Sequence, residues 1–124
     1  MSTRHPKQIP PRLSALDGQV AEILAQDGAV LGHMYLRLVE LTIYRGVLRR
    51  GLKREWGLEL FATAEPTVFG VGEDRWLLSG TDIWQEVAEF EDGQVYFRGT
   101  KYPIRWLSHE LAQSVIQDNE WDHM

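Results

Sequence analysis

Glu86 is the residue whose surroundings in this sequence most favour chemistry. It lies in the segment "DIWQEVAEFEDGQVYFRGTKYPI", in which Asp92 and Gly93 separate two runs of alternating apolar residues. An Asp-Gly pair between such runs predicts a type I′ turn and therefore a β-hairpin. The resulting register places Glu86 on the apolar face of the hairpin, beside Trp84 and opposite Gly99, because alternate residues of a strand share one face. A carboxylate at that position would lose its hydration unless it were paired.

A buried carboxylate has a raised pKa, which suits a general acid or base and also an anchor for a cationic ligand. Aromatic side chains from the same half of the chain could surround such a ligand through cation–π contacts. The predicted ligand-binding residues are therefore Glu86, Trp84, Trp76, Tyr102 and Trp106. The competing interpretation pairs Glu86 with Lys101 or an arginine, or turns it to solvent at a β-bulge, and leaves the hairpin as a scaffold only.

The sequence offers little for metal or nucleophilic chemistry. It contains no cysteine, and its four histidines, His5, His33, His109 and His123, lack the spacing of a metal-binding pair. We therefore predict no metal, no cofactor and no catalytic residue. His33 lies in an apolar segment, where a hydrogen-bonded core histidine is favoured over a catalytic one. A small acid/base enzyme using Glu86 or His33 is the third functional hypothesis.

The segment "LKREWGLEL", Leu52 to Leu60, is similar to the end of a Nudix box, the motif whose glutamates hold magnesium in that family. Only Glu55 matches those glutamates, since Gly51, Arg54 and Thr42 stand at the other positions. The resemblance covers nine of the 124 residues, so it implies neither a magnesium site nor a family for the chain.

Thirteen basic and eighteen acidic residues give a formal net charge of −5, which argues against nucleic acid as the main partner. The charges are unevenly distributed. Residues 37–54 carry six basic side chains and one acidic one, whereas residues 73–92 carry seven acidic side chains and one basic one. The basic segment supports an alternative function, a nucleic-acid-binding accessory protein that uses Arg45, Arg49, Arg50, Lys53 and Arg54.

Helical periodicity dominates the first half of the chain. The capping-box spacing at Ser14 and the apolar stripe that follows it predict a helix over residues 14–27. Two overlapping apolar stripes predict a largely buried helix from Val30 to about Arg50, with a strand through Val39 to Tyr44 as the rival. The segment "LKREWGLELFA" predicts another short helix.

After Pro66 the composition changes to aromatic and β-branched residues punctuated by glycines, which is typical of strands. "TVFGVGEDRWLLSG" predicts one hairpin, and the segment around Asp92-Gly93 predicts the other. Ser108 then fits the N-cap of a final amphipathic helix, "LSHELAQSVIQDN". The order predicts an α+β domain with N-terminal helices, an antiparallel sheet of about four strands built from hairpins, and a C-terminal helix packed on the sheet.

The length predicts a single domain, which we expect to span residues 13–118. The prolines and basic residues of 1–12 predict a flexible basic arm, and the alternating acids of 119–124 predict a solvated acidic tail. No apolar stretch is long enough to span a membrane, and no signal peptide is visible. Together with the lack of cysteine, this favours a cytoplasmic location.

The leading functional hypothesis is therefore a small, non-catalytic binding or interaction module with a site for a cationic or aromatic small molecule. The predicted sheet faces and the second helix carry more apolar surface than one small core buries, which favours a homodimer. A different protein partner is also compatible with the uneven charge, and nucleic acid is the less favoured partner.

Overall fold

The computed structural model describes residues 8–44, 52–70, 72 and 74–123. These residues form a six-stranded antiparallel sheet with the strand order β4-β3-β2-β1-β6-β5. The strands are β1 (Val20–Leu24), β2 (Val30–Tyr44), β3 (Leu52–Ala64), β4 (Arg75–Leu78), β5 (Gln94–Phe97) and β6 (Thr100–Trp106). The helices are α1 (Pro11–Leu16), α2 (Pro66–Phe69), α3 (Gly80–Glu91), α4 (His109–Asp118) and the 3₁₀ helix η1 (Trp121–His123).

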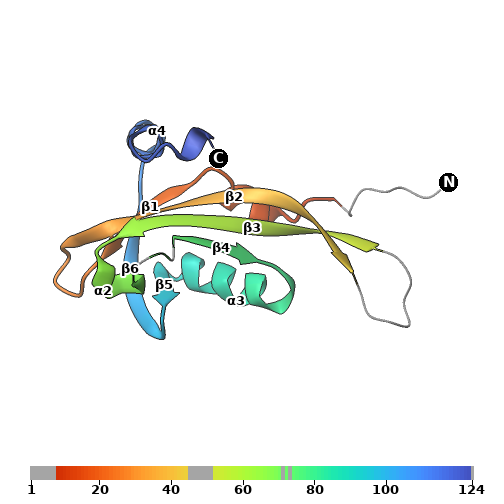
Figure 1. The fold of residues 1–124 in the computed structure, drawn as a ribbon, viewed down its shortest axis with the longest axis horizontal. Coiled ribbons are helices and arrows are strands. Elements are labelled where there is room, and N and C mark those ends of the chain that lie inside the picture. The colour runs from red at the N-terminus through yellow and green to blue at the C-terminus, as the bar shows by residue number, and fades with distance from the viewer. Residues whose placement is uncertain (1–7, 45–51, 71, 73, 124) are drawn as a thin grey trace.

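The predicted α+β class and antiparallel sheet are confirmed, but the sheet has six strands rather than about four. Figure 1 shows α2 and α3 on one side of the sheet and α4 on the other. In the part of the chain that the structure describes, no helix is both long and apolar enough to cross a membrane.

The longest elements, β2 and β3, overturn two predicted helices: the one from Val30 to about Arg50, as far as Tyr44, beyond which residues 45–50 lie outside the described residues, and the one in "LKREWGLELFA". The two strands pair in continuous antiparallel register from Gly32 opposite Ala64 to Tyr44 opposite Leu52. β2 is internal to the sheet and is apolar on both faces, so its pattern contains no simple alternation. A strand buried on both faces and a largely buried helix give similar apolar patterns, and the rival strand interpretation was the right one.

The helix predicted over residues 14–27 is also wrong after Leu16. α1 ends at Leu16, and Gly18 adopts a φ of 81°, which ends the helical path. Pro11 opens α1 at its first position, where a missing N–H costs nothing, so residues 11 and 12 are helical rather than part of a flexible arm. Residues 1–7 of the predicted arm lie outside the described residues. Val20–Leu24 form β1 between β2 and β6.

The predicted hairpin around Asp92-Gly93 is replaced by α3 and a shorter hairpin. Ile83, Val87 and Phe90 recur at helical spacing and are all buried, and this repeat outweighed the apparent alternation. Asp92 caps the carboxyl end of α3, and Gly93 follows with a φ of 77°. Asp-Gly therefore ends a helix here, because the positive φ that suits a type I′ turn also suits the residue after a helix.

The true hairpin joins β5 to β6 through Arg98 and Gly99, with φ values of 53° and 80°. Two successive positive φ angles define the type I′ class that had been assigned to Asp92-Gly93. The sequence prediction thus identified the right turn type six residues too early.

The hairpin predicted in "TVFGVGEDRWLLSG" is also wrong, because its first half forms α2. Pro66 occupies the first position of α2, and Val68 and Phe69 are buried. Only the second half is a strand, β4, which pairs with β3 from Leu58 opposite Leu78 to Phe61 opposite Arg75.

Two apolar clusters hold the layers together. The larger one lies between the sheet and α2, α3 and β5, and contains Met34, Leu36, Phe69, Val87 and Phe90 among others. The smaller one lies on the opposite side of the sheet and consists of Val20, Phe61, Ala112, Ile116 and Trp121, with Tyr35, Leu107 and Val115 beside it. The C-terminal helix is confirmed as α4, and the Ser108 hydroxyl accepts a hydrogen bond from the Leu111 amide at 3.4 Å.

The predicted acidic tail is not wholly solvated. Trp121 is only 5% exposed, and its ring stacks on Tyr35 with the centroids 5.8 Å apart. Burial of the large apolar ring of Trp121 is favourable, so η1 packs against the sheet although the neighbouring residues are acidic.

Candidate functional site

Helix α3 presents one buried face and two flanks of different chemistry. Ile83, Val87 and Phe90 form the buried face. One flank carries Asp82, Glu86 and Glu89, which we call the acidic flank. These residues are three or four positions apart, so they lie on the same side of the helix.

Glu86 is half-buried, and its pKa is raised. The largest cause is the loss of hydration on burial, and the charges of Glu89 and Asp82 add to it. The predicted hairpin places Glu86 on the apolar face of a strand, whereas in the structure the residue is half-buried on helix α3. No hydrogen bond or ion pair joins Glu86 to another described residue.

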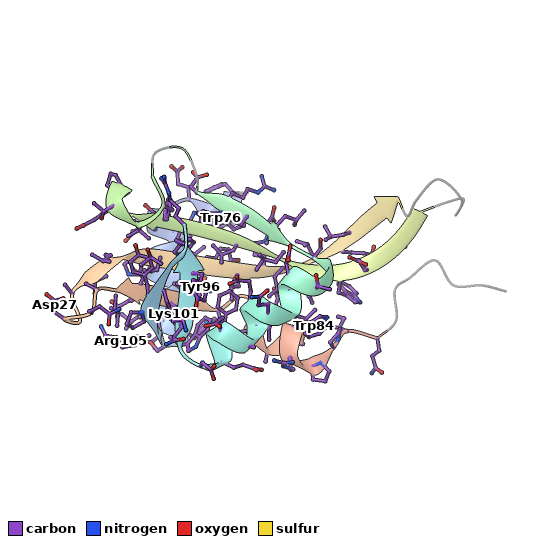
Figure 2. All side chains as sticks on the ribbon, turned by 90° about the horizontal axis from the view of Figure 1, so that it is seen from below. Asp27, Trp76, Trp84, Tyr96, Lys101 and Arg105 are labelled. Atoms are coloured by element: carbon purple, nitrogen blue, oxygen red, sulfur yellow. The ribbon has the colours of Figure 1, made fainter. Side chains whose placement is uncertain are left out.

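Glu89, by contrast, has a cation beside it. The Nζ atom of Lys101 in β6 lies 4.0 Å from its Oε2 atom, which is buried and accepts no hydrogen bond from the described residues. The same Nζ atom lies 5.2 Å from the centroid of the Tyr96 ring in β5. Hydrogen bonding with Tyr96 and the charge of Glu89 raise the pKa of Lys101. Figure 2 shows Tyr96 and Lys101 side by side on the β5–β6 hairpin next to α3.

The other flank of α3 is occupied by α1. Arg12 donates to both carboxylate oxygens of Glu91, from Nε to Oε2 at 2.9 Å and from its terminal nitrogen to Oε1 at 2.6 Å. Its guanidinium also lies 5.6 Å from the centroid of the Trp84 ring. Hydrogen bonding with Arg12 lowers the pKa of Glu91. The contacts of Arg12 with Glu91 and Trp84 join α1 to α3. The Glu91 carboxylate on this flank therefore has a partner.

The four aromatic residues predicted to line a pocket are spread over separate contacts. Trp76 packs against Phe97 at 5.1 Å, and Trp106 packs edge-on to Phe90 at 6.4 Å. Trp84 is 41% exposed on the far flank of α3, and Figure 2 shows it on the opposite side of that helix from Trp76. Tyr102 lies against Phe97 at 6.4 Å. These aromatic residues mainly build the core, and none of these ring contacts involves Glu86.

Two residues of the nucleic-acid hypothesis lie in the described part of the chain, and neither is helical. Arg45, Arg49 and Arg50 lie outside the described residues, while Lys53 and Arg54 belong to β3. Arg54 lies 3.8 Å from Glu40 across the β2–β3 pair. Lys53 and Arg54 therefore belong to a strand and not to the predicted basic helix end.

His33, the other residue considered for acid/base chemistry, lies on β2 with its Nε2 atom 4.0 Å from Glu22. Glu22 also accepts a hydrogen bond of 2.7 Å from Arg105 on β6. The three side chains form a charged row across β2, β1 and β6 on the α4 side of the sheet. Among the described residues, no group of three or more histidines and acids could hold a metal ion.

Sequence reasoning missed Glu89 as a neighbour of Glu86, and it missed the contacts of Lys101 with Glu89 and Tyr96. The signal that could have found Glu89 and Asp82 is the helical spacing with Glu86, which the hairpin prediction hid. Lys101 and Tyr96 are directly paired on β5 and β6, and only the correct turn at Arg98-Gly99 gives that register. Comparison of the chain with protein-family models, with curated proteins and with solved structures finds no match.

Proposed function

We propose that this protein is a non-catalytic binding module that takes a cationic group at the acidic flank of α3. The observation that carries the proposal is the unequal pairing of Glu86 and Glu89. Glu89 has Lys101 within 4.0 Å, whereas Glu86 is half-buried beside it with a raised pKa and no cation from the described residues. A ligand cation would neutralise the second carboxylate and relieve its repulsion with Glu89 and Asp82.

The surroundings of the Lys101 ammonium group indicate which kind of ligand suits the acidic flank. Its ammonium group lies between a carboxylate and an aromatic ring, at 4.0 Å from Glu89 and 5.2 Å from the Tyr96 centroid. Carboxylates and aromatic faces both attract ammonium and guanidinium groups. Tyr96 is 40% exposed, so part of its ring is accessible to a ligand that approaches Glu86. The expected ligands are therefore amines or guanidines, either free or as lysine or arginine side chains of a partner.

Direct binding of a small diamine tests the proposal. Isothermal titration of the full chain with putrescine at pH 7 and low salt is expected to give a dissociation constant on the order of 1 mM, because a few partly exposed ion pairs supply only a few kcal/mol. Glu86→Gln is expected to weaken binding about tenfold, which corresponds to one charge-assisted hydrogen bond.

The matched control is Glu110→Gln, which removes the same charge from an exposed position on α4. It is expected to leave the putrescine affinity within about twofold, since the remaining effect is long-range and screened. Equal losses in the two variants would show that binding follows net charge rather than the acidic flank. No measurable binding by the wild-type chain would refute the proposal.

A further inference from the structure

We propose that Asp27 is a site of spontaneous backbone modification, at which the Asp27-Gly28 pair cyclises to a succinimide and reopens as isoaspartate. The pair lies in the turn of residues 25–29, which joins β1 to β2, and both residues are exposed. Figure 2 shows Asp27 at one end of the molecule, beyond the strands that this turn joins. The inference does not depend on the acidic flank, which lies on α3.

The reaction needs only the atoms of the chain and water. The amide nitrogen of Gly28 attacks the Cγ atom of Asp27, and its proton leaves together with the carboxyl hydroxyl as one water molecule. The product is a cyclic imide. Water then opens the imide at either carbonyl group, which restores aspartate or leaves isoaspartate, in which the chain continues through Cγ. Glycine favours the first step because it has no side chain to hinder its nitrogen and adopts backbone conformations that other residues avoid.

The chain offers three candidates for this reaction, which share the same dipeptide. They are Asp17-Gly18, Asp27-Gly28 and Asp92-Gly93. The three glycines also share a positive φ, of 81°, 92° and 77° respectively. Neither the dipeptide nor this angle separates the three pairs, so the difference between them lies in what holds the carboxyl group and the glycine nitrogen in place.

Both reacting groups of Asp17-Gly18 are bound to β2. The Leu38 amide donates a hydrogen bond to Oδ1 of Asp17 at 2.8 Å, and the Gly18 amide donates to the carbonyl oxygen of Leu36 at 2.8 Å. Leu36 is fully buried in the larger apolar cluster. Release of this pair therefore requires the segment after α1 to separate from a central strand of the sheet.

The Asp92-Gly93 backbone is held between α3 and β6. The Asp92 amide donates to the Ala88 carbonyl oxygen at 3.1 Å, and the Gly93 amide donates to that of Phe90 at 3.0 Å. The Gly93 carbonyl oxygen accepts a hydrogen bond of 2.9 Å from the Ile104 amide. Phe90 is buried in the larger cluster, so release of this pair disturbs both the end of a packed helix and the start of the β5–β6 hairpin.

Asp27-Gly28, by contrast, has only local partners among the described residues. The Gly28 amide donates to the Ala25 carbonyl oxygen at 2.9 Å, and the Ala29 amide donates to Oδ1 of Asp27 at 3.0 Å. The Ala25 amide closes the turn by donating to the Ala29 carbonyl oxygen at 2.8 Å. This turn can open without breaking a pair of β1 with β2. Opening of a loop tip costs less free energy than opening of a packed helix or strand, so Asp27 is released most often.

The turn can also accommodate the product. Isoaspartate adds one carbon to the backbone between Asp27 and Gly28, and this carbon falls outside the paired residues, which end at Leu24 opposite Val30. The register of β1 and β2 is already irregular between Ile23 and Leu24, next to the turn. An extra backbone atom at such a place alters the strands only locally, so we expect the modified chain to keep its fold and to accumulate.

Incubation of the folded full chain in weakly acidic buffer, followed by peptide mapping, tests the site. Mass spectrometry detects the succinimide, which is one water lighter than the parent peptide, and chromatography separates isoaspartate from aspartate. We expect both products to form about tenfold faster at Asp27 than at Asp17 or Asp92. Asp27→Glu is the matched control, because it keeps the carboxylate but requires a larger, less favoured ring. It is expected to abolish modification at residue 27 and to leave the other two sites unchanged.

The same incubation in guanidinium chloride separates the effect of the fold from that of the sequence. The unfolded chain contains the same three pairs without their hydrogen bonds, so the three rates are expected to agree within about threefold. An unmodified Asp27 in the folded chain would overturn the proposal, as would modification of Asp17 or Asp92 at the same rate as Asp27. So would an Asp27 that keeps its lead in the denaturant, because the lead would then come from the sequence and not from the turn.

Discussion

Glu86 and Glu89 are three positions apart on α3, yet their surroundings differ in one respect that matters for binding. Glu89 has an ammonium group 4.0 Å away, and Glu86 has its charge opposed by burial and by two neighbouring acids. The sequence identified Glu86 because a carboxylate stood among aromatic and apolar residues. That reason holds on a helix as well as on a strand, since both conformations place Glu86 at the border of the core.

The raised pKa of Glu86 predicts how the stability of Glu86→Gln depends on pH. The folded protein holds the proton to a higher pH than the unfolded chain, whose glutamates titrate near about 4.3. The wild-type chain therefore loses stability as the pH rises through the interval between those two pKa values. Glutamine does not titrate, so the variant gains stability relative to wild type between pH 4 and pH 7.

Because Glu86 is about half-exposed, we expect this relative gain to be small, up to about 0.5 kcal/mol. Urea denaturation of both proteins at pH 4 and pH 7 measures it. The free energy of unfolding of the variant minus that of wild type is compared at the two pH values, and the titration of the other carboxyls cancels in this comparison. If the stability of Glu86→Gln relative to wild type stays constant or falls as the pH rises, the result would contradict a raised pKa of Glu86.

At the scale of elements, the errors in the sequence prediction have physical causes. β2 is apolar on both faces because it lies inside the sheet with clusters on either side, and two apolar faces resemble two helical stripes. Asp92-Gly93 can end a helix or form a turn, and the buried repeat of Ile83, Val87 and Phe90 decides between them. α4 was predictable because its cap and its apolar face are local features.

Gly99 and Gly32 are needed for different reasons, the first for its backbone conformation and the second for the close approach of β3. Gly99 has a φ of 80° and open space around a Cβ atom, so Gly99→Ala is expected to cost about 1 kcal/mol of stability through backbone strain alone. A Cβ atom on Gly32 would lie 2.1 Å from the Thr63 carbonyl oxygen in β3. Backbone cannot move aside as a side chain does, so Gly32→Ala is expected to cost about 3 kcal/mol.

Denaturant unfolding of the two variants checks this ranking, with each compared to wild type under the same conditions. A Gly32→Ala variant as stable as wild type would show that β2 and β3 do not approach each other at Thr63 as the sheet requires. A Gly99→Ala variant as stable as wild type would contradict the positive φ at Gly99 and so the assignment of the hairpin turn to Arg98-Gly99.

At the scale of the whole molecule, one sheet separates two surfaces. The acidic flank of α3 and the Lys101–Tyr96 contact lie on one side, and the side chains of Arg37, Glu59 and Arg75 lie on the α4 side. The uneven charge of the sequence does not reveal where these side chains lie, because their positions depend on the strand order β4-β3-β2-β1-β6-β5. Pairings between segments far apart in sequence, such as β1 with β6, have no local signal.

The most direct test of the central claim is an NMR titration of the Glu86 side-chain carboxyl, assigned with Glu86→Gln, in the absence and presence of putrescine. The account predicts a pKa above the usual glutamate value in the free protein and a fall toward that value when the diamine binds, because a nearby cation favours the ionised form. The carboxyl signal of Glu110 serves as the internal reference, and its chemical shift is predicted not to respond to putrescine. An ordinary Glu86 pKa that putrescine leaves unchanged would contradict a cation-binding role for the acidic flank.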